Sequence, residues 1–555
     1  MRSSFFGLNV ASNGLYTAQR GLDVINHNIN NVNTPGYSRQ MSVQTAAPAM
    51  SVHDGTGMIG TGSLSASVDR IHDEYLDFKY WSESDTFGEW DVKAIQLTDI
   101  EKTFNEPSDS GFNVVINNYF AAVQELSKDP SSLAARKLLI GEGVTLTKYF
   151  NSVAAHLEKL QSDLNYNIKL KVDEINSYGR QIQQLNKQIY AAEIDNNKAN
   201  DLRDQRTYLV DKLSKLVNVQ ASEVAVGVLP NGQQEKHFLI TINGKAFVDH
   251  YSLSQLKVEQ REKKLNVDED IENLYEVSWE DGNLLEVKGG ELKGYIDMRD
   301  GNEGVDQGNG ASPNYKGVPF YVKKLNEFVR KFALAMNEGI TVQTDDLNGT
   351  IYSKTTSGHA DGYGMKKPGG STSPAGIRLF TMKGWSHKQN AVSEIYTSEF
   401  IGSANSVDDI GNLYNKLTAK NFSISGDLIH EESGEYNIAA SSTSGLSEDG
   451  SNLLNLIEMR HDGHLFMEGN PEDYMKALIS TLGIDTQQAM QISKTQIVIM
   501  GQIENRRSSV SGVSLNEEMS NMVKYQHAYT AAAKMISTLS EIYDTLVNRV
   551  GISGR

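Results

Sequence analysis

The chain of 555 residues contains no cysteine. Disulfide bonds, thiolate metal sites and cysteine nucleophiles are therefore excluded. Positive charge is also scarce, because 52 lysine and arginine residues stand against 70 aspartate and glutamate residues, which gives a net charge of -18. Such a chain is poorly suited to bind a nucleic-acid backbone or an anionic lipid surface. We expect no nucleic acid among its partners.

Long apolar runs are missing as well. No stretch approaches the roughly 18 consecutive apolar residues that a spanning helix needs, which predicts no membrane insertion. The start of the chain has no apolar core of signal-peptide length before Asn9, Ser12 and Asn13 interrupt it. We therefore expect a protein that either stays inside the cell or leaves it without a cleaved signal peptide. At roughly 150 residues per domain, the length predicts three or four compact units.

The N-terminal segment carries apolar residues at alternating steps of three and four. This spacing is typical of the a and d positions of a coiled coil. The pattern stops at Pro35, which disfavours a helical conformation for Thr34 before it. The members of this row are Leu8, Ala11, Leu15, Ala18, Leu22, Ile25, Ile29 and Val32.

The C-terminal segment repeats the pattern. Ser514 and Glu517 have the spacing of a capping box, in which the serine caps the helix and the glutamate reaches back to it. Two apolar rows then run side by side. Together they form an apolar face that is wider than a two-stranded coiled coil requires, which predicts an assembly interface. The first row is Leu515, Met519, Met522, Gln526, Tyr529, Ala533 and Ile536. The second is Tyr525, Ala528, Ala532, Met535, Leu539, Ile542 and Leu546.

Helical and extended patterns alternate between the ends. We predict an extended hairpin arm over about 35–67, helices over about 68–104, 113–127 and 131–216, a β-rich domain over 218–316 and a returning helix over 317–340. Residues 341–470 are rich in Gly, Ser, Thr, Asn and Asp and predict an outer β domain. A helix resumes at Asn470-Pro471-Glu472-Asp473. The expected fold class is α+β, with a discontinuous long-helix coiled-coil bundle formed by residues 1–217 and 471–555.

The candidate catalytic and metal-binding motifs fail on spacing. His430-Glu431 lacks a second histidine four residues on, which would place two zinc ligands on one helical face. His461 and His464 flank a turn and have no third ligand nearby in the sequence. The acidic segment 345–350 lacks calcium-loop spacing, and the glycine- and lysine-rich segment 362–371 lacks phosphate-loop spacing. We expect no catalytic residue, no metal and no cofactor.

Four motifs resemble one known family. The first, at residues 28–40, reads Asn-Ile-Asn-Asn-Val-Asn-Thr-Pro-Gly-Tyr-Ser-Arg-Gln and resembles the N-terminal signature of bacterial flagellar axial proteins, in particular their hook-associated branch. The others are Asn200–Arg206, Gly289–Tyr295 before Met298-Arg299-Asp300, and Ser511–Glu518. They occur in the family's order. The resemblance covers roughly 1–340 and 471–555, and residues 341–470 match no pattern of the family.

The resemblance implies a structural subunit of the flagellum at the hook–filament junction and no enzyme. It implies that the terminal helices pack as a coiled coil and that copies of the chain form a ring. The implied partners are further copies, the hook protein, a second junction protein (hook-associated protein 3) and a dedicated export chaperone on the C-terminal helix. The implied location is extracellular, after export through the flagellum's own type III channel without signal cleavage.

The turn at 33–37 and the terminal rows are the assembly residues that we expect on this basis. They are Leu8, Leu15, Leu22, Ile25, Ile29, Val32, Asn33, Thr34, Pro35, Gly36, Tyr37, Leu515, Met519, Met522, Tyr525, Tyr529, Ile536, Leu539 and Leu546. Two other functions stay open. One is an extracellular hydrolase or adhesin carried by residues 341–470, and the other is a cytosolic coiled-coil scaffold, which the terminal motifs disfavour.

Overall fold

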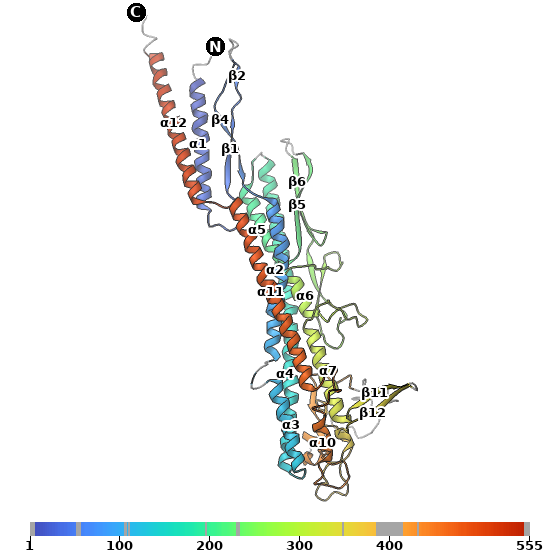
Figure 1. Cartoon of the computed structure of the whole chain (residues 1–555). Coiled ribbons are helices and arrows are strands. Elements are labelled where there is room, and N and C mark those ends of the chain that lie inside the picture. The colour runs from blue at the N-terminus through green and yellow to red at the C-terminus, as the bar shows by residue number, and fades with distance from the viewer. Residues whose placement is uncertain are drawn as a thin grey trace, which may run out of the picture.

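The computed structural model describes residues 6–51, 57–104, 108, 111–194, 197–228, 234–346, 349–384, 414–429 and 432–548. It is an elongated helical rod with a pair of helices at one end and small sheets along its side (Figure 1). The first and last helices both lie at that end. The expected α+β class is confirmed. Among the described residues, no helix combines the length and apolar character that crossing a membrane requires.

Helices make up most of the rod. They are α1 (Phe6–Asn30), α2 (Glu74–Phe104), α3 (Phe112–Lys128), α4 (Leu133–Ile194), α5 (Asn200–Leu216), α6 (Glu291–Asp300), α7 (Val318–Glu338), α9 (Gly426–Ile429), α10 (Ser451–Glu458), α11 (Pro471–Ser511) and α12 (Leu515–Asn548). Helix α4 has 62 residues, which at 1.5 Å per residue corresponds to a length of about 90 Å. Helices α2, α4 and α11 run along the rod (Figure 1).

The strands form small antiparallel sheets. β1 (Gln40–Ala46) pairs with β4 (Ser63–Arg70), and β2 (Met50–Ser51) pairs with β3 (Met58–Ile59). A four-stranded sheet has the order β5 (Val219–Val228), β6 (Gln234–Ile242), β7 (Lys245–Asp249), β8 (Ser252–Leu253). Three further pairs join β9 (Leu256–Gln260) to β10 (Tyr275–Trp279), β11 (Thr341–Asp346) to β12 (Gly349–Lys354), and β13 (Phe380–Met382) to β14 (Phe422–Ile424).

Two hydrophobic cores stabilise the rod. The larger core joins α2, α3, α4, α7, α10 and α11, and in it the fully buried rings of Phe150 and Phe328 stack with centroids 5.1 Å apart. The smaller core packs β5–β7, β9 and β10 against α4 and α5. None of the described residues of α1 or α12 belongs to either core. The rod does combine early and late segments, as expected, but the outermost helices do not share its core, which corrects the single bundle that we predicted.

Three expected boundaries also change. Residues 68–70 are strand rather than helix, because β4 pairs with β1 as far as Gln40 opposite Arg70. The helix expected over 131–216 is two helices, α4 and α5, which pack against each other. Helix α6 lies inside the expected β-rich domain 218–316. A Cβ on Gly294 of α6 would lie 2.8 Å from the Glu89 carbonyl oxygen, so this glycine lets α6 approach α2 closely.

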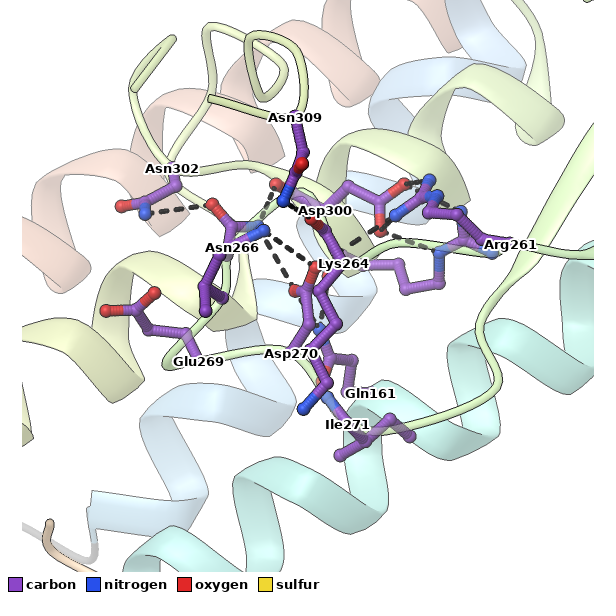
Figure 2. A network of polar contacts seen from close by, with 12 residues as sticks. Gln161, Arg261, Lys264, Asn266, Glu269, Asp270, Ile271, Asp300, Asn302 and Asn309 are labelled. Carbon is purple, nitrogen blue, oxygen red and sulfur yellow. Dashed lines mark hydrogen bonds and ion pairs between the residues drawn. The ribbon is translucent and has the colours of Figure 1, made fainter. Parts of the chain in front are cut away.

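A buried polar network fastens the loop after β9 and the end of α6 onto α4 (Figure 2). The Gln161 Nε2 of α4 donates 2.9 Å hydrogen bonds to Asp270 Oδ1 and to the carbonyl of Arg299. Arg299 and Arg261 both bond the carboxylate of Asp300. Burial alone would raise the pKa of Asp300, but the two guanidinium groups hold that pKa below its usual value. The network therefore keeps charged groups paired inside the rod.

The described part of 341–470 is less separate from the rod than expected. Phe380 of β13, Phe422 of β14 and Leu453 of α10 are buried in the larger core, so this polar segment supplies some of the rod's own packing. The β11–β12 hairpin projects from the rod (Figure 1). Residues 385–413 and the His430-Glu431 pair lie outside the described residues. The expected helix start is confirmed, because Asn470 Oδ1 accepts a 2.9 Å hydrogen bond from the Asp473 amide.

Truncation of a core ring tests this packing. Phe150→Ala should lower the free energy of unfolding by about 3–5 kcal/mol, because it removes a fully buried ring that contacts several others. Urea denaturation followed by circular dichroism measures the change. Tyr166→Ala, at an exposed position of the same helix, is the matched control and should change stability by no more than about 0.5 kcal/mol. Equal effects of the two substitutions would contradict the assigned core.

Candidate functional site at the joint between the terminal helices and the rod

Helices α1 and α12 form an antiparallel pair with a regular seven-residue step. A Cβ on Gly7 would lie 3.3 Å from Leu539, one on Gly14 would lie 3.9 Å from Ala532, and one on Gly21 would lie 2.6 Å from the ring of Tyr525. One more step along α1, Asn28 Nδ2 donates a 3.2 Å hydrogen bond to Glu518 Oε2. The contact line on α1 is therefore Gly7, Gly14, Gly21 and Asn28, which faces Leu539, Ala532, Tyr525 and Glu518.

The other side of α1 packs against the β1–β4 hairpin. The Thr17 hydroxyl donates a 3.1 Å hydrogen bond to the carbonyl of Ser63 at the start of β4. The side-chain Nδ2 of Asn13 donates a hydrogen bond to the carbonyl of Thr61, at 3.4 Å. Helix α1 thus lies between the hairpin and α12, as Figure 1 shows.

The expected assembly residues divide into two groups by exposure. Ile25 is buried. The half-buried members are Leu8, Leu15, Leu22, Ile29 and Val32 of the N-terminal row, Tyr37 of the turn, and Met522, Tyr525, Ile536 and Leu539 of α12. The exposed members of the set are Leu515, Met519, Tyr529, Leu546 and the turn residues Asn33 to Gly36. Further apolar residues of α12 are exposed, namely Val523, Met535, Ile542 and Val547. An apolar surface on the terminal pair therefore remains open.

Asn28 is the centre of the joint between this pair and the rest of the molecule. Its side chain makes two hydrogen bonds with the backbone of Gln40. Asn28 Nδ2 donates to the Gln40 carbonyl, and the Gln40 backbone amide donates to Asn28 Oδ1, each at 2.9 Å. The Tyr37 hydroxyl donates to Asn28 Oδ1 at 2.7 Å. Together with the bond to Glu518, these contacts tie the end of α1 to β1, to the turn and to α12. Asn28 is buried, so each of these polar partners matters.

The turn at 33–37 is held against α5. Gly36 has φ +77°, and a Cβ there would lie 2.8 Å from Cβ of Tyr208, so both conformation and space favour glycine. Next to the turn, the Ser38 amide donates a 2.8 Å hydrogen bond to Asp204 Oδ2. Burial raises the pKa of Tyr37, and the nearby carboxylates of Asp201 and Asp204 raise it further. Tyr37 is therefore a neutral hydrogen-bond donor at physiological pH.

The start of α5 supplies the carboxylates of the joint. Asp201 Oδ1 accepts from Gln40 Nε2 at 2.6 Å and lies 3.2 Å from His27 Nε2. Asp204 Oδ1 pairs with Arg70 at 2.8 Å. Burial raises the pKa of Asp204, while the bonds from Ser38 and Arg70 oppose that rise.

The start of α12 closes the joint from the other side. The Arg39 amide donates to the Ser511 carbonyl at 2.7 Å, and Arg39 Nη1 lies 2.5 Å from Glu517 Oε2. Glu517 therefore contacts Arg39, whereas the predicted capping box had it reaching back to Ser514. Three of the four sequence motifs, at 28–40, 200–206 and 511–518, thus meet at one place in the structure.

An ion-pair cluster beside the joint fastens the end of α11 to the rod. Arg507 of α11 lies 3.0 Å from Asp77 of α2 and 3.0 Å from Asp211 of α5. The indole Nε1 of Trp81 donates to Asp211 at 2.7 Å. Burial raises the pKa of Asp211 to about 6, against the opposing effect of Arg507. The charges of Arg507 and the two carboxylates therefore hold a stretch of α11 with many exposed side chains.

A surface groove of about 960 Å³ runs along this cluster. Its lining mixes apolar and charged side chains of the turn, α2, α4, α5 and α11, among them Pro35, Tyr80, Tyr208, Met500 and Arg507. The fourth motif contributes Glu291, which pairs with Lys171 at 2.9 Å and Lys215 at 3.1 Å. Each of these charges has an opposite partner, which suits a contact surface better than a reacting centre.

The histidines and carboxylates that the sequence offered as candidate catalytic or metal sites do not form such a site among the described residues. His464 contacts Asp462 in its own turn, at 2.9 Å. Within the described ranges, no cluster of three or more His, Asp or Glu side chains is arranged to hold a metal ion. His359, which the sequence did not single out, is buried, and burial lowers its pKa to about 4. Its Nε2 accepts from the Ala439 amide at 2.9 Å, so the ring supports local packing.

Comparison with known proteins decides the family. Residues 97–354 match the model of the flagellar hook-associated protein FlgK helical domain. Residues 8–37 match a flagella basal body rod protein model, and residues 505–549 match the flagellar basal body rod FlgEFG protein C-terminal model. Flagellar hook-associated protein 1 of Bacillus subtilis is 29% identical over 582 residues, which cover 100% of both chains. The chain belongs to the flagellar hook-associated protein 1 family.

More distant relatives of the family agree with this. Flagellar hook-associated protein 1 of Salmonella typhimurium is 24% identical over 98% of this chain and 99% of its own. The flagellar hook junction protein FlgK from Burkholderia pseudomallei has a similar fold, with a TM-score of 0.53 and 14% sequence identity, over 79% of this chain and 100% of that chain. The family expected from the four motifs is thus confirmed.

The sequence reasoning missed the true contact line between α1 and α12. It took the leucine row as the seam, whereas the glycines one position earlier in each heptad face α12. The signal was present in the sequence, because Gly7, Gly14 and Gly21 recur every seven residues. Small residues at a regular step allow close approach of two helix backbones, whereas larger side chains hold the helices further apart.

A matched pair of glycine substitutions tests the contact line. Gly21→Ala should separate α1 from α12, since the added Cβ would lie 2.6 Å from the Tyr525 ring, whereas Gly14→Ala meets only an ordinary contact at 3.9 Å. Amide hydrogen exchange across 6–30 and 515–548 measures the effect. We expect about tenfold faster exchange in the Gly21 variant, which corresponds to about 1.4 kcal/mol. Equal exchange rates in the two variants would refute the register.

The raised pKa of Asp211 predicts a dependence of stability on pH. Its folded-state pKa of about 6 exceeds the model value of 3.8, so the ionised form is disfavoured by folding and stability rises as pH falls through 6. Between pH 7.5 and pH 4.5 this one group should add about 2 kcal/mol. Asp211→Asn should remove that component from a pH series of urea denaturations. Asp173→Asn, at an exposed position of α4, is the control and should show the same pH dependence of stability as the wild type. If the stability of Asp211→Asn also changed with pH as the wild type does, the raised pKa of Asp211 would be contradicted.

Proposed function

We propose that the chain is a structural subunit of the bacterial flagellum at the junction between hook and filament. The observation that carries the proposal is the terminal helix pair, which the three family motifs hold at one end of the rod with its apolar rows open. The hook-associated protein 1 relatives match over the whole chain, including that pair. The function therefore lies in assembly.

The terminal pair is the element that we assign to subunit contacts. Helix α12 packs on α1 and leaves Met519, Val523, Met535, Ile542 and Leu546 exposed. Neighbouring copies would cover these side chains and extend the pair into a coiled-coil inner domain of a ring. Burial contributes about 25 cal/mol per Å² of apolar surface, and the ring repeats each contact. Assembly is then cooperative although each single contact is modest.

The proposed partners and the proposed route to the assembly site rest on the family resemblance. One face of the ring would dock on the hook protein, and the other would receive the second junction protein, hook-associated protein 3. Before export, a dedicated chaperone would cover the exposed apolar row of α12. A chain without cysteine suits passage in the unfolded state through the type III channel to an extracellular position, because no disulfide can form prematurely.

A hydrolase or adhesin carried by 341–470 is not favoured. Part of that segment packs into the rod core, His359 supports local packing, and His464 pairs with Asp462 in its own turn. The relatives are flagellar hook-associated proteins along their full length, this segment included.

Deletion of the gene tests the proposal at the level of the cell. Electron microscopy should show hooks that lack filaments, with flagellin released into the medium, and a plasmid copy of the gene should restore the filaments. Hooks that carry normal filaments in the deletion strain would refute a junction role.

Charge placed on the exposed apolar row tests the interface itself. Met519→Glu combined with Ile542→Glu should abolish filament attachment, because each carboxylate would be buried without a partner in the ring. The same chain should fold normally, since both positions are exposed in the subunit. Ser520→Glu, at an exposed polar position of the same helix, is the matched control and should restore filaments fully. Full motility of the double variant would contradict the assigned surface.

A further inference from the structure

The exposed methionines of this chain concentrate at the end of the molecule that carries the terminal helix pair. On the β1–β4 hairpin and its β2–β3 extension, Met41, Met50 and Met58 are 52%, 60% and 72% exposed. On α12, Met519 and Met535 are 52% and 57% exposed. We call these five residues the apical methionines. Their thioethers are open to solvent along two elements that flank α1.

Other methionines in the same chain are fully protected. Met298, Met336, Met459 and Met475 lie in the larger core of the rod and are at most 1% exposed. These four methionines are ordinary core packing of the rod, whereas five of the seven methionines exposed among the described residues lie at the apex and the other two are Met467 and Met490. A flexible, polarisable thioether can adapt to the shape of a partner surface, which suits a contact surface between copies of the chain.

We propose that the apical methionines are an oxidation-sensitive contact surface, which peroxide inactivates before assembly and which a neighbouring copy of the chain protects afterwards. The second half of this inference rests on the proposed function. In the reaction, a sulfur lone pair attacks one oxygen of hydrogen peroxide and the O–O bond breaks. The oxygen stays on sulfur as the sulfoxide, the other leaves as water, and two electrons pass from sulfur to the peroxide.

The sulfoxide changes the contact in a defined way. It replaces an apolar sulfur with a strongly polar S=O group, and burying that group without a hydrogen-bond donor is unfavourable. The chain has no cysteine that could consume the oxidant first. Exposed methionine is thus the chief sulfur target on its surface.

The first test measures which methionines react. The full-length chain is treated briefly with hydrogen peroxide, digested and analysed by mass spectrometry. We expect the apical methionines to be oxidised at least about tenfold faster than Met298, Met336, Met459 and Met475 in the same sample, as their exposure requires. Similar rates for the two groups would overturn the proposal.

The second test measures the consequence for assembly. Treated and untreated chains are added to cells that carry bare hooks, and incorporation is counted by immunogold electron microscopy. A variant with Met41→Leu, Met50→Leu, Met58→Leu, Met519→Leu and Met535→Leu receives the same treatment. It keeps the exposed Met467 and Met490, which lie elsewhere and remain oxidisable. We expect oxidised wild type to be incorporated at least about tenfold less than untreated wild type. The treated leucine variant should be incorporated as well as the untreated leucine variant.

The outcomes separate this inference from the proposed function. Loss of incorporation in both treated chains would place the damage outside the apical methionines and overturn the inference. Equal incorporation of treated and untreated wild type would also overturn it, while the junction role would stand. Failure of the untreated wild type to bind bare hooks would count against the junction role and, with it, against protection by a neighbouring copy.

Discussion

The side chain of Asn28 is the contact on which the arrangement of the molecule depends. It bonds the backbone of Gln40, the hydroxyl of Tyr37 and the carboxylate of Glu518, so one buried amide joins helix α1, the turn, β1 and α12. No apolar core continues from the rod into the terminal pair among the described residues. The direction of the pair relative to the rod is therefore set by hydrogen bonds, which are specific in geometry, and apolar packing plays a smaller part there.

The regular glycine step imposes a second constraint, on the pair itself. Gly7, Gly14 and Gly21 bring α1 close to α12 along one line, and this line continues to Asn28 without a break in the heptad. The contact at Gly21 fixes the register, because the Tyr525 ring occupies the space that any larger residue there would need. Register and joint reinforce each other, since a slip of the pair would also remove Glu518 from Asn28. The leucines next to the glycines are left half-buried and available to a further neighbour.

Much of this architecture could be predicted from the sequence, and the reasons for the failures are physical. Periodicity identified α1, α7 and α12, whose apolar residues recur at steps of three and four, and the capping sequence at 470–473 identified the start of α11. Periodicity missed α6, which lies inside the expected β-rich domain and whose Gly294 allows close packing on α2. It also assigned 341–470 to an outer domain, since the few apolar residues that reach the rod core are widely spaced in a polar segment.

The joint was harder to predict than the helices. The motifs at 28–40, 200–206 and 511–518 could each be recognised, but their meeting depends on tertiary contacts between residues hundreds of positions apart, such as Asn28 with Glu518. A polar pair of this kind has no periodic signature, and its partners are visible only once the chain is folded. The apolar rows could be found because their spacing is local. The line of α1 that faces α12 is formed by glycines, because their small size allows the two helices to approach closely. A search for hydrophobic residues alone selects the leucines beside them instead.

The buried core of the rod and the exposed apolar surface of the terminal helix pair lie in different parts of the molecule, so stability and contact with other proteins depend on different residues. The rod carries the buried aromatic cluster around Phe328, so its stability does not depend on neighbours. The terminal pair has one internal contact line and leaves Met519, Val523, Met535, Ile542 and Leu546 of α12 exposed, so these side chains are not covered within the subunit. Changes in the rod should therefore alter how much folded subunit exists, whereas changes in the pair should alter whether that subunit assembles. A polar joint suits this division, because hydrogen bonds to Asn28 fix the pair's direction without merging the two parts into a single core.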